Sequence, residues 1–386
     1  MKENHMKKFL ALFLSLVMVL ALAACGGGSS DTTTAPGSDA GNSTGSSLNV
    51  GVFYYTYADT YISSVRTALD AQLTAAGISY TNYDCNNTQA TQNDYVRTAV
   101  TNGCNLLIVN LCTSGSADAA KAIMDIAGDI PVIFFNRAVE GDGEEGTVLG
   151  AYDNICFVGT DAPEAGHLQG QMVGQYVLDN YDAIDLNGDG VISYALFKGD
   201  EANVEAIYRT QYGVEDADAL LTAAGKPALS YFDANNAAKY QVDQAGNWSA
   251  QAASDYMNTN LASYNESNGN MIELIICNND NMAEGAIAAL NTAGYNLGDG
   301  ASTTIPVFGV DATEAAQELI AAGKMTGTVK QDAEGMAAAI TATAKAIGEG
   351  KTVTDAIAAA AATGDIYSIA EGIANKLYVA YAPFTA

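Results

Sequence analysis

The segment DLNGDGVIS, residues 185–193, has the spacing of oxygen-bearing side chains that is found in calcium-binding loops. Asp185, Asn187 and Asp189 stand at loop positions 1, 3 and 5, and a glycine follows at position 6, where such a loop turns sharply. A complete loop needs a bidentate Glu at position 12, but that position holds Leu196. The match is therefore either accidental, or the last ligand comes from another part of the chain.

A second set of residues suits a ligand that carries many hydroxyls. Asp, Asn, Gln and Arg have planar groups with several hydrogen-bonding sites, and aromatic faces pack on the C–H patches of a pyranose. Trp248, the only tryptophan, lies in the polar segment GNWSAQ, where a role in the core is not obvious. For each Asp or Asn alone, a helix cap is the simpler interpretation. The other candidates are Asp59, Tyr61, Asn136, Arg137, Asn203, Glu205, Arg209, Asn278, Asn279, Asp280 and Asp311.

The elements that must position these residues are short apolar runs alternating with Ala-rich segments of helical periodicity. We predict strands at residues 48–55, 105–111, 130–136, 154–160, 191–197, 272–278 and 305–311, and helices that include 62–76, 90–102, 117–127, 162–178 and 312–322. Strands that are apolar on both faces and separated by helices indicate an α/β fold with parallel, covered sheets. Such sheets bind ligands beyond the carboxyl ends of their strands, which is where the polar candidates recur.

The N-terminus has the pattern of an export signal. Three lysines precede an apolar run over residues 9–24, and Cys25 directly follows Leu-Ala-Ala, as in a bacterial lipobox. We predict a signal peptide at 1–24, lipidation of Cys25 and a flexible tether at 25–47, whose Gly, Ser and Thr content cannot support a core. The alternative is an ordinary cleavage site with an incidental cysteine.

Charge and cysteine content exclude several classes of protein. The formal net charge of −28 repels nucleic acids and anionic membrane surfaces, so no nucleic-acid partner is expected. Five of the six cysteines follow Cys25 at irregular spacing, without a disulfide framework or a metal-binding pattern. We expect most of them to be buried, inert thiols.

Six segments together resemble the bacterial galactose/glucose-binding proteins, the substrate-binding components of sugar ABC importers. They are YADTYISSVR, IPVIFFN, FVGTDAPEAGHLQG, DLNGDGVISYALFKGD, IELIICNNDNMAEGAIAALN and IPVFGVDATEA, and the resemblance covers the chain from residue 48 to about 383. It implies two Rossmann-like lobes that are joined by a three-strand hinge and hold glucose or galactose between them. The implied first lobe comprises residues 48–158 and 333–378, and the second comprises 159–332 and 379–386.

The resemblance implies that ten residues contact the sugar, with two aromatic rings stacking on its faces. Asn203 and Glu205 stand where the family has a His and an Asp, and Gln331 replaces an Asn. Lengthening a carboxylate by one methylene moves its oxygens by about 1 Å, so another aldose or a glycoside is an alternative ligand. The implied sugar-binding residues are Asp59, Tyr61, Asn136, Asn203, Glu205, Arg209, Trp248, Asn279, Asp311 and Gln331.

The resemblance also supplies the missing loop ligand. In the family this carboxylate comes from a neighbouring strand, and the matching residue is Glu273. If the two strands are neighbours, loop and carboxylate meet at the edge opposite the sugar cleft, so that a bound Ca²⁺ would be structural. The alternative is a surface turn without metal. The implied ligands are the side chains of Asp185, Asn187, Asp189 and Ser193, the Val191 carbonyl oxygen and both oxygens of Glu273.

The expected function is that of a lipid-anchored, extracytoplasmic and monomeric sugar receptor that serves an ABC permease. A sensory lipoprotein for chemotaxis or a two-component system would use the same binding event and is the main alternative. A glycosidase with Asp59 and Glu205 as acid and base is disfavoured, since no nucleophile elbow or phosphate loop is present. A sugar repressor would need a basic helix-turn-helix, in whose place the export signal stands.

Overall fold

Two sheets organise residues 48–386, the part of the chain that this computed structural model describes. The predicted signal peptide, Cys25 and the tether lie outside the described residues. The first sheet has the order β12-β13-β5-β4-β3-β1-β2, and only the β12–β13 pair is antiparallel. Its strands are β1 (Asn49–Tyr54), β2 (Ser79–Asp84), β3 (Leu106–Val109), β4 (Val132–Phe135), β5 (Ile155–Gly159), β12 (Tyr367–Ile369) and β13 (Lys376–Val379).

The second sheet has the order β14-β11-β10-β9-β6-β7, and β8 also pairs with β6. All of its pairs are parallel except β11–β14. Its strands are β6 (Ser193–Lys198), β7 (Ser230–Tyr231), β8 (Gln241–Val242), β9 (Leu274–Cys277), β10 (Val307–Asp311), β11 (Gly327–Lys330) and β14 (Ala382–Phe384).

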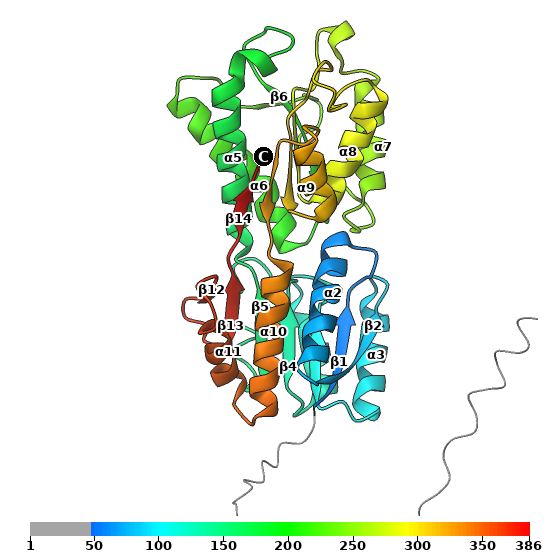
Figure 1. The fold of residues 1–386 in the computed structure, drawn as a ribbon, viewed down its shortest axis with the longest axis vertical. Helices are drawn as coiled ribbons and strands as arrows, with labels where there is room; N and C mark the ends of the chain where they lie inside the picture. Colours follow the sequence, from blue (N-terminus) through cyan, green and yellow to red (C-terminus); the bar gives the residue numbers. More distant parts are fainter. Residues whose placement is uncertain (1–47) are drawn as a thin grey trace, which may run out of the picture. The chain divides into compact units, whose positions relative to one another are not determined.

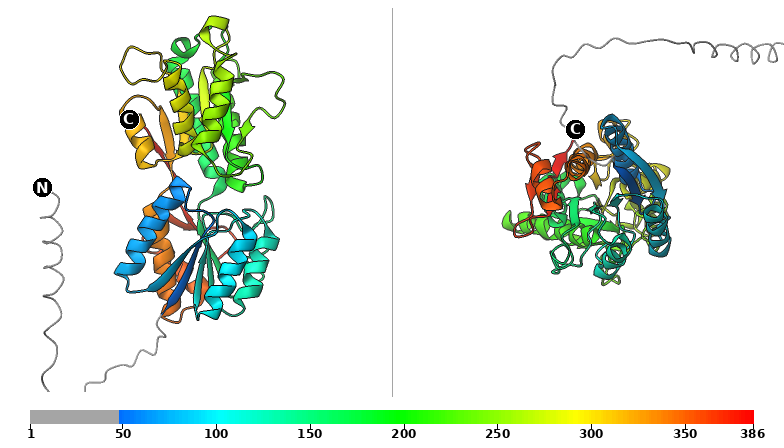
Figure 2. Two further views of the ribbon diagram at one scale, coloured as in Figure 1. Left: turned by 90° about the vertical axis from the view of Figure 1, so that its right-hand side faces the viewer. Right: turned by 90° about the horizontal axis from the view of Figure 1, so that it is seen from below.

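Helices cover both faces of each sheet, as strands without a polar face require. Figure 2 shows α2 and α10 on one face of the first sheet and α3 and α4 on the other. The helices of the first lobe are α2 (Thr60–Ala75), α3 (Gln89–Thr101), α4 (Ala117–Ala127), α10 (Ala333–Gly348) and α11 (Val353–Ala361). Those of the second lobe are α5 (Ala162–Ile184), α6 (Val204–Ala223), α7 (Ala250–Leu261), α8 (Asp280–Thr292) and α9 (Glu314–Ala321).

The chain crosses between the two sheets three times (Figure 1). It passes from β5 into α5, returns from β11 into α10, and leaves again from β13 to β14. The three-strand hinge between two α/β lobes is therefore confirmed. Each lobe is built from separate stretches of the sequence.

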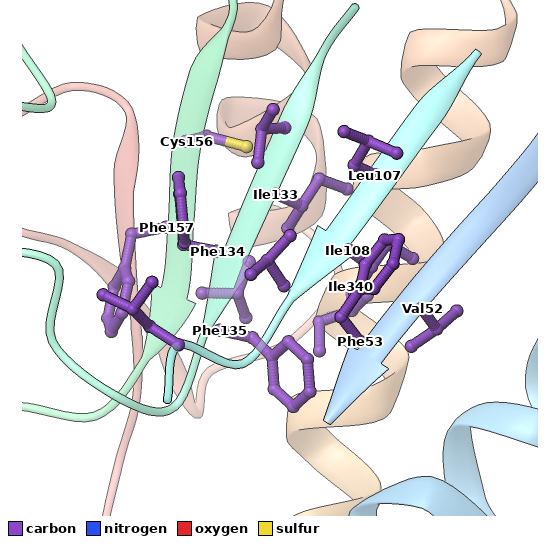
Figure 3. Close-up of a cluster of buried hydrophobic side chains, with 14 of the residues drawn as sticks. Val52, Phe53, Leu107, Ile108, Ile133, Phe134, Phe135, Cys156, Phe157 and Ile340 are labelled. Atoms are coloured by element: carbon purple, nitrogen blue, oxygen red, sulfur yellow. The ribbon is translucent and has the colours of Figure 1, made fainter. Parts of the chain in front are cut away.

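The first lobe has its core around the four central strands β1, β3, β4 and β5. Phe134 and Phe135 are neighbours on β4, so their side chains point to opposite faces, yet both are fully buried (Figure 3). Ile340 of α10 packs in the same cluster. Apolar side chains on both faces explain why these strands were readily predicted.

The predicted strands and helices are all present. Each predicted strand agrees with an observed one to within two residues at either end, and α5 extends six residues beyond its prediction, to Ile184. The remaining strands were not predicted, and most are short or lie at sheet edges. None of the helices in residues 48–386 is long and apolar enough to cross a membrane.

A stripe of three glycines brings α5 and α6 into close contact. Gly166, Gly170 and Gly174 are four residues apart and therefore share one face of α5. A Cβ at Gly166 would lie 2.5 Å from the carbonyl oxygen of Tyr208, and one at Gly170 would overlap that of Tyr212. This contact matters for the cavity described below, because α6 carries two of its residues.

Replacing Gly170 by Ala should lower the free energy of unfolding by about 1–3 kcal/mol, because the added methyl group forces the two helices apart. A loss would be informative, because at a helix position with free space the same change from Gly to Ala stabilises the helix by about 0.8–1 kcal/mol. Urea denaturation would measure it, with exposed Gln171→Ala on the same helix as the control. Equal stability of the two variants would contradict the close packing.

Candidate functional site

All ten residues that were predicted to bind a sugar line one cavity between the two lobes. The space within its walls, part of which opens to solvent, is about 370 Å³. Tyr55, Ile62 and Arg137 complete its wall. Nine of the ten predicted residues are buried, and Asn136 is half-buried.

In the first lobe, the cavity lies at the carboxyl ends of β1 and β4. Asp59 caps α2, since its Oδ1 accepts a hydrogen bond from the Ile62 amide at 2.7 Å. Its Oδ2 accepts from the Tyr55 hydroxyl at 2.7 Å. Tyr61 lies in the first turn of α2, with its hydroxyl 3.7 Å from the sulfur of Met336.

Asn136 and Arg137 follow β4 directly. Asn136 has a positive φ of 59°, and its Oδ1 accepts a hydrogen bond from the Asn110 side chain at 3.1 Å. The Arg137 guanidinium lies 4.1 Å from the ring centre of Tyr55 and forms an ion pair at 3.4 Å with Asp200 of the second lobe. The lobes are therefore joined by a charge pair at the rim of the cavity.

In the second lobe, two cavity residues are also helix caps. Asn203 caps α6 through the Ala206 amide at 3.1 Å, and Asn279 caps α8 through the Met282 amide at 3.0 Å. Trp248 has a positive φ of 56°, and its ring lies where a side chain at Gly199 would be. Gly199 is therefore needed for the position of this ring.

Arg209 connects the cavity with the hinge. It is 4% exposed, and it donates to the Asn278 carbonyl at 2.9 Å, the Gln331 side chain at 3.3 Å and the Tyr381 hydroxyl at 3.0 Å. The Tyr381 hydroxyl also bonds to Thr160 at 2.9 Å. Thr160, Gln331 and Tyr381 lie on the three crossings between the sheets, so one guanidinium links all of them to the cavity.

Two buried carboxyls lie near Arg209. Burial raises the pKa of Glu205, and Arg209 opposes this shift. Burial also raises the pKa of Asp311 well above its ordinary value, again against the effect of Arg209. Asp311 ends β10 with a φ of 129°, and Ala312 follows with 56°. Such backbone strain at non-glycine residues is typical of functional sites.

Three buried donor atoms of the cavity residues have no hydrogen-bond partner within the described part of the chain. They are Arg137 Nε, Arg209 Nε and Gln331 Nε2. Buried donors are normally paired with protein groups or water, so these three atoms are candidates for donating to a molecule held in the cavity. No side-chain pair described here resembles an activated nucleophile with its base, and the arrangement is suited to holding a polar molecule.

The sequence did not single out Tyr55 or Ile62. Tyr55 directly follows β1, which is the only signal that could have identified it. Asn278 and Asp280 were candidates by position but do not line the cavity. The Asn278 carbonyl supports Arg209, and Asp280 accepts hydrogen bonds from the Thr328 hydroxyl at 2.6 Å and the Thr313 amide at 2.8 Å.

The loop at 185–193 lies between α5 and β6, at the amino end of β6. Asp185 accepts hydrogen bonds from the Gly188 and Gly190 amides, and Asp189 accepts one from the Val191 amide at 2.8 Å. Because β6 and β9 are neighbours, Glu273 lies beside the loop. Loop and carboxylate thus meet at the edge of the sheet opposite the cavity.

Glu273 already binds the loop through hydrogen bonds. Its Oε1 accepts from the Leu186 and Asn187 amides, and its Oε2 accepts from the Ser193 amide and hydroxyl. The Ser193 hydroxyl also donates to the Met271 carbonyl at 2.6 Å. Within residues 48–386 no three Asp, Glu, His or Cys side chains are grouped ready to hold a metal ion. The oxygen donors fit Ca²⁺ by type and charge, but in this arrangement the carboxylates accept hydrogen bonds from loop amides.

Comparison with known proteins identifies the family. Residues 50–352 match the model of the periplasmic binding protein domain. The chain is 33% identical over 309 residues to the D-galactose/methyl-galactoside binding periplasmic protein MglB of Haemophilus influenzae, covering 79% of this chain and 83% of that protein. It is 25% identical over 289 residues to a putative rhizopine-binding protein of Rhizobium meliloti, with coverages of 74% and 80%.

Solved structures share the fold. An ABC transporter solute-binding protein of Clostridium phytofermentans with bound β-D-glucose has a TM-score of 0.64 at 20% identity, covering 88% of this chain and 94% of its own. The myo-inositol-binding protein of Caulobacter has a TM-score of 0.60 at 23% identity, with coverages of 80% and 90%. Proteins of this family bind solutes for transport and are not enzymes. The match over residues 50–352 shows that the chain belongs to the periplasmic binding proteins.

Proposed function

We propose that this protein is an extracytoplasmic receptor that binds a monosaccharide, galactose or glucose, and delivers it to an ABC permease. One observation carries the proposal: hydroxyl-matching side chains from both lobes and the hinge surround a single buried cavity. A ligand that contacts both lobes stabilises their closed arrangement, which a permease can distinguish from the open one.

The cavity contains the groups that a pyranose needs. Three carboxylates accept hydroxyl hydrogens, two guanidiniums donate to ring or hydroxyl oxygens, and side-chain amides do both. Tyr61 and Trp248 supply aromatic faces from different lobes, as stacking on the two sides of one ring requires. The names of the relatives support the same class, since one is named for D-galactose and one structure contains β-D-glucose.

A glycoside is the second candidate ligand. A further cavity lies beside the first, and Glu205 lines both of them. Its wall includes Phe157, Tyr208 and Tyr378 together with Asp161, a combination of aromatic and polar groups that also suits a hydroxylated substituent. A sugar ring in the first cavity could therefore carry an aglycone into the second.

We further propose that Cys25 anchors the protein to the membrane through a lipid and that the chain functions as a monomer. Transport is preferred to sensing because the relatives are solute-binding components of transporters. Genes for a permease and an ATPase beside this one would support transport. A neighbouring histidine kinase without a permease would support the sensory alternative.

Calorimetric titration of the full chain with glucose, galactose, ribose, xylose and methyl galactoside tests the proposed ligand. Micromolar or tighter binding of one hexose would support a monosaccharide receptor. Tighter binding of the methyl galactoside than of galactose would favour the glycoside. Binding of none of these sugars would contradict the proposal.

Replacing Asp59 by Asn should weaken sugar binding by about 10–100-fold, the range expected for losing a hydrogen bond to a charged acceptor. Asn keeps an oxygen for the Ile62 amide, so α2 retains its cap, whereas Ala would also remove the cap. Calorimetry would give the affinity and thermal melting the stability. If the affinity and the melting temperature are both unchanged, Asp59 does not contact the sugar.

Sugar affinity should fall as the pH is lowered from 7 to 5. Burial raises the pKa of both Glu205 and Asp311, so these groups gain protons at a higher pH than the value of about 4 that is ordinary for carboxyls. A protonated carboxyl loses acceptor capacity for hydroxyls and no longer balances Arg209. Calorimetry across this range would detect the decrease, and Glu205→Gln should reduce its size. A flat profile in the unmodified protein would contradict the assigned role of these carboxylates.

We also propose that the loop at 185–193 binds a structural Ca²⁺ with Glu273. Support comes from the types of the donor groups and from the negative charge that is concentrated around them. The pKa of nearby Tyr181 is raised mainly by burial and then by the carboxylates of Asp185, Asp189 and Glu273. Calcium binding would have to turn Glu273 from the loop amides toward the ion. The hydrogen bonds of Glu273 mean that its removal would weaken the loop even without metal, so another residue makes the better test.

Replacing Asp189 by Asn should lower calcium affinity at least tenfold, because it removes one ligand charge while the side-chain oxygen that accepts from the Val191 amide remains. In the unmodified protein, calcium should raise the melting temperature and a chelator should lower it. Asp233→Asn changes a similar exposed turn and serves as the control. A calcium response that is equal in both variants, or absent from the unmodified protein, would overturn the proposal.

A further inference from the structure

Two cysteines that are far apart in the sequence meet behind the cavity. Cys85 follows β2 by one residue, and Cys112 follows β3 by three. Strands β2 and β3 lie on opposite sides of β1, so their ends are about 9–10 Å apart. The two segments must converge over the end of β1 to bring their side chains together.

Hydrogen bonds hold both segments to the end of β1. The Cys85 amide donates to the Tyr54 carbonyl at 3.0 Å. The Tyr55 carbonyl accepts from the Asn87 amide at 2.6 Å and from the Cys112 thiol at 3.9 Å. Tyr55 is the residue whose hydroxyl binds Asp59, so the convergence lies directly behind the cavity wall.

Gln92 of α3 bonds to both cysteines. This side chain is fully buried; its Nε2 donates to the Cys85 sulfur at 3.6 Å, and its Oε1 accepts from the Cys112 amide at 3.1 Å. Cys112, together with burial, raises the pKa of the Cys85 thiol, as expected of a neighbouring thiol. Two cysteines that bond to the same buried carboxamide are close neighbours in space, which is the first condition for a disulfide.

We propose that Cys85 and Cys112 form a reversible disulfide in the oxidising environment outside the cytoplasm. Cys112 is the more exposed residue of the two, at 5% against 0%, and its thiolate attacks an external disulfide and releases one of its thiols. Cys85 then attacks the mixed disulfide and releases the second thiol. One sulfur–sulfur bond breaks and one forms, and the two protons of the protein thiols pass to the leaving thiols.

The position of the pair also determines when it can react. Asn87, two residues after Cys85, contacts Asn247 and the Ala245 carbonyl of the second lobe. Gly115, three residues after Cys112, lies against Val204. The oxidant therefore reaches the thiols when the lobes separate. Once formed, the bond ties together the two segments that hold Tyr55 in place.

Incubating the full native chain with oxidised glutathione tests this proposal. Trypsin cleaves after Arg66, Arg97 and Lys121, which places Cys85 in peptide 67–97 and Cys112 in peptide 98–121. After free thiols are blocked, the two peptides should be found linked by mass spectrometry, and a reducing agent should separate them. The linked protein should melt about 5 °C higher, since the bond closes a large loop of the unfolded chain.

Cys104→Ser is the matched control, because Cys104 is buried and lies in the same peptide as Cys112. This variant should still form the link and show the melting shift, whereas Cys85→Ser and Cys112→Ser should show neither. Linkage through Cys104, or linkage that appears only after unfolding in urea, would overturn the proposal. Stable mixed disulfides with glutathione at both sites would do so too.

Discussion

The burial of the Arg209 guanidinium is the constraint on which the cavity depends. A desolvated cation is costly unless acceptors and negative charge surround it, and here the side chain is almost completely removed from solvent. Its hydrogen-bond partners include Gln331 and Tyr381, each on a different crossing between the sheets, and Glu205 lies close by. Compensating this single charge therefore fixes the hinge relative to the cavity wall, while Nε has no hydrogen-bond partner among the described residues.

In the second sheet, the acidic loop lies at the amino ends of the strands and the cavity at their carboxyl ends, and the short strand β9 runs from one to the other. Glu273 immediately precedes β9, while Asn279 follows it by two residues and caps α8 at the cavity. The four residues of β9 span only about 13 Å and are fully buried. A rigid element therefore connects the acidic loop with the cavity. Ordering of that loop would restrict the motion of Glu273, which directly precedes the strand that positions Asn279.

Much of this organisation could be predicted from the sequence, for physical reasons that also explain the failures. Strands such as β4 are apolar on both faces and stand out, and the residues after them fall at the edge where parallel sheets bind ligands. Strand β2, with the sequence SYTNYD, lies at an edge with no fully buried residue, so it lacks this signal. The meeting of Cys85 and Cys112 depends on two segments converging over a third, which spacing along the chain does not encode. Tyr55 was overlooked because it ends an apolar, aromatic run that was predicted to be a buried strand, so a tyrosine there was expected to belong to the core.

The order in which the strands occur along the chain affects how the protein acquires its structure. In the first sheet β5 pairs with β13, about 220 residues later, and in the second β11 pairs with β14, which ends at Phe384. Neither sheet is complete until residues 376–384 have been synthesised. Contacts over such separations slow folding, because the entropy of closing a long loop is lost before the contact forms. Both lobes therefore depend on residues 376–384, and a truncation after residue 375 would remove β13, which carries the edge strand β12, from the first sheet and the edge strand β14 from the second.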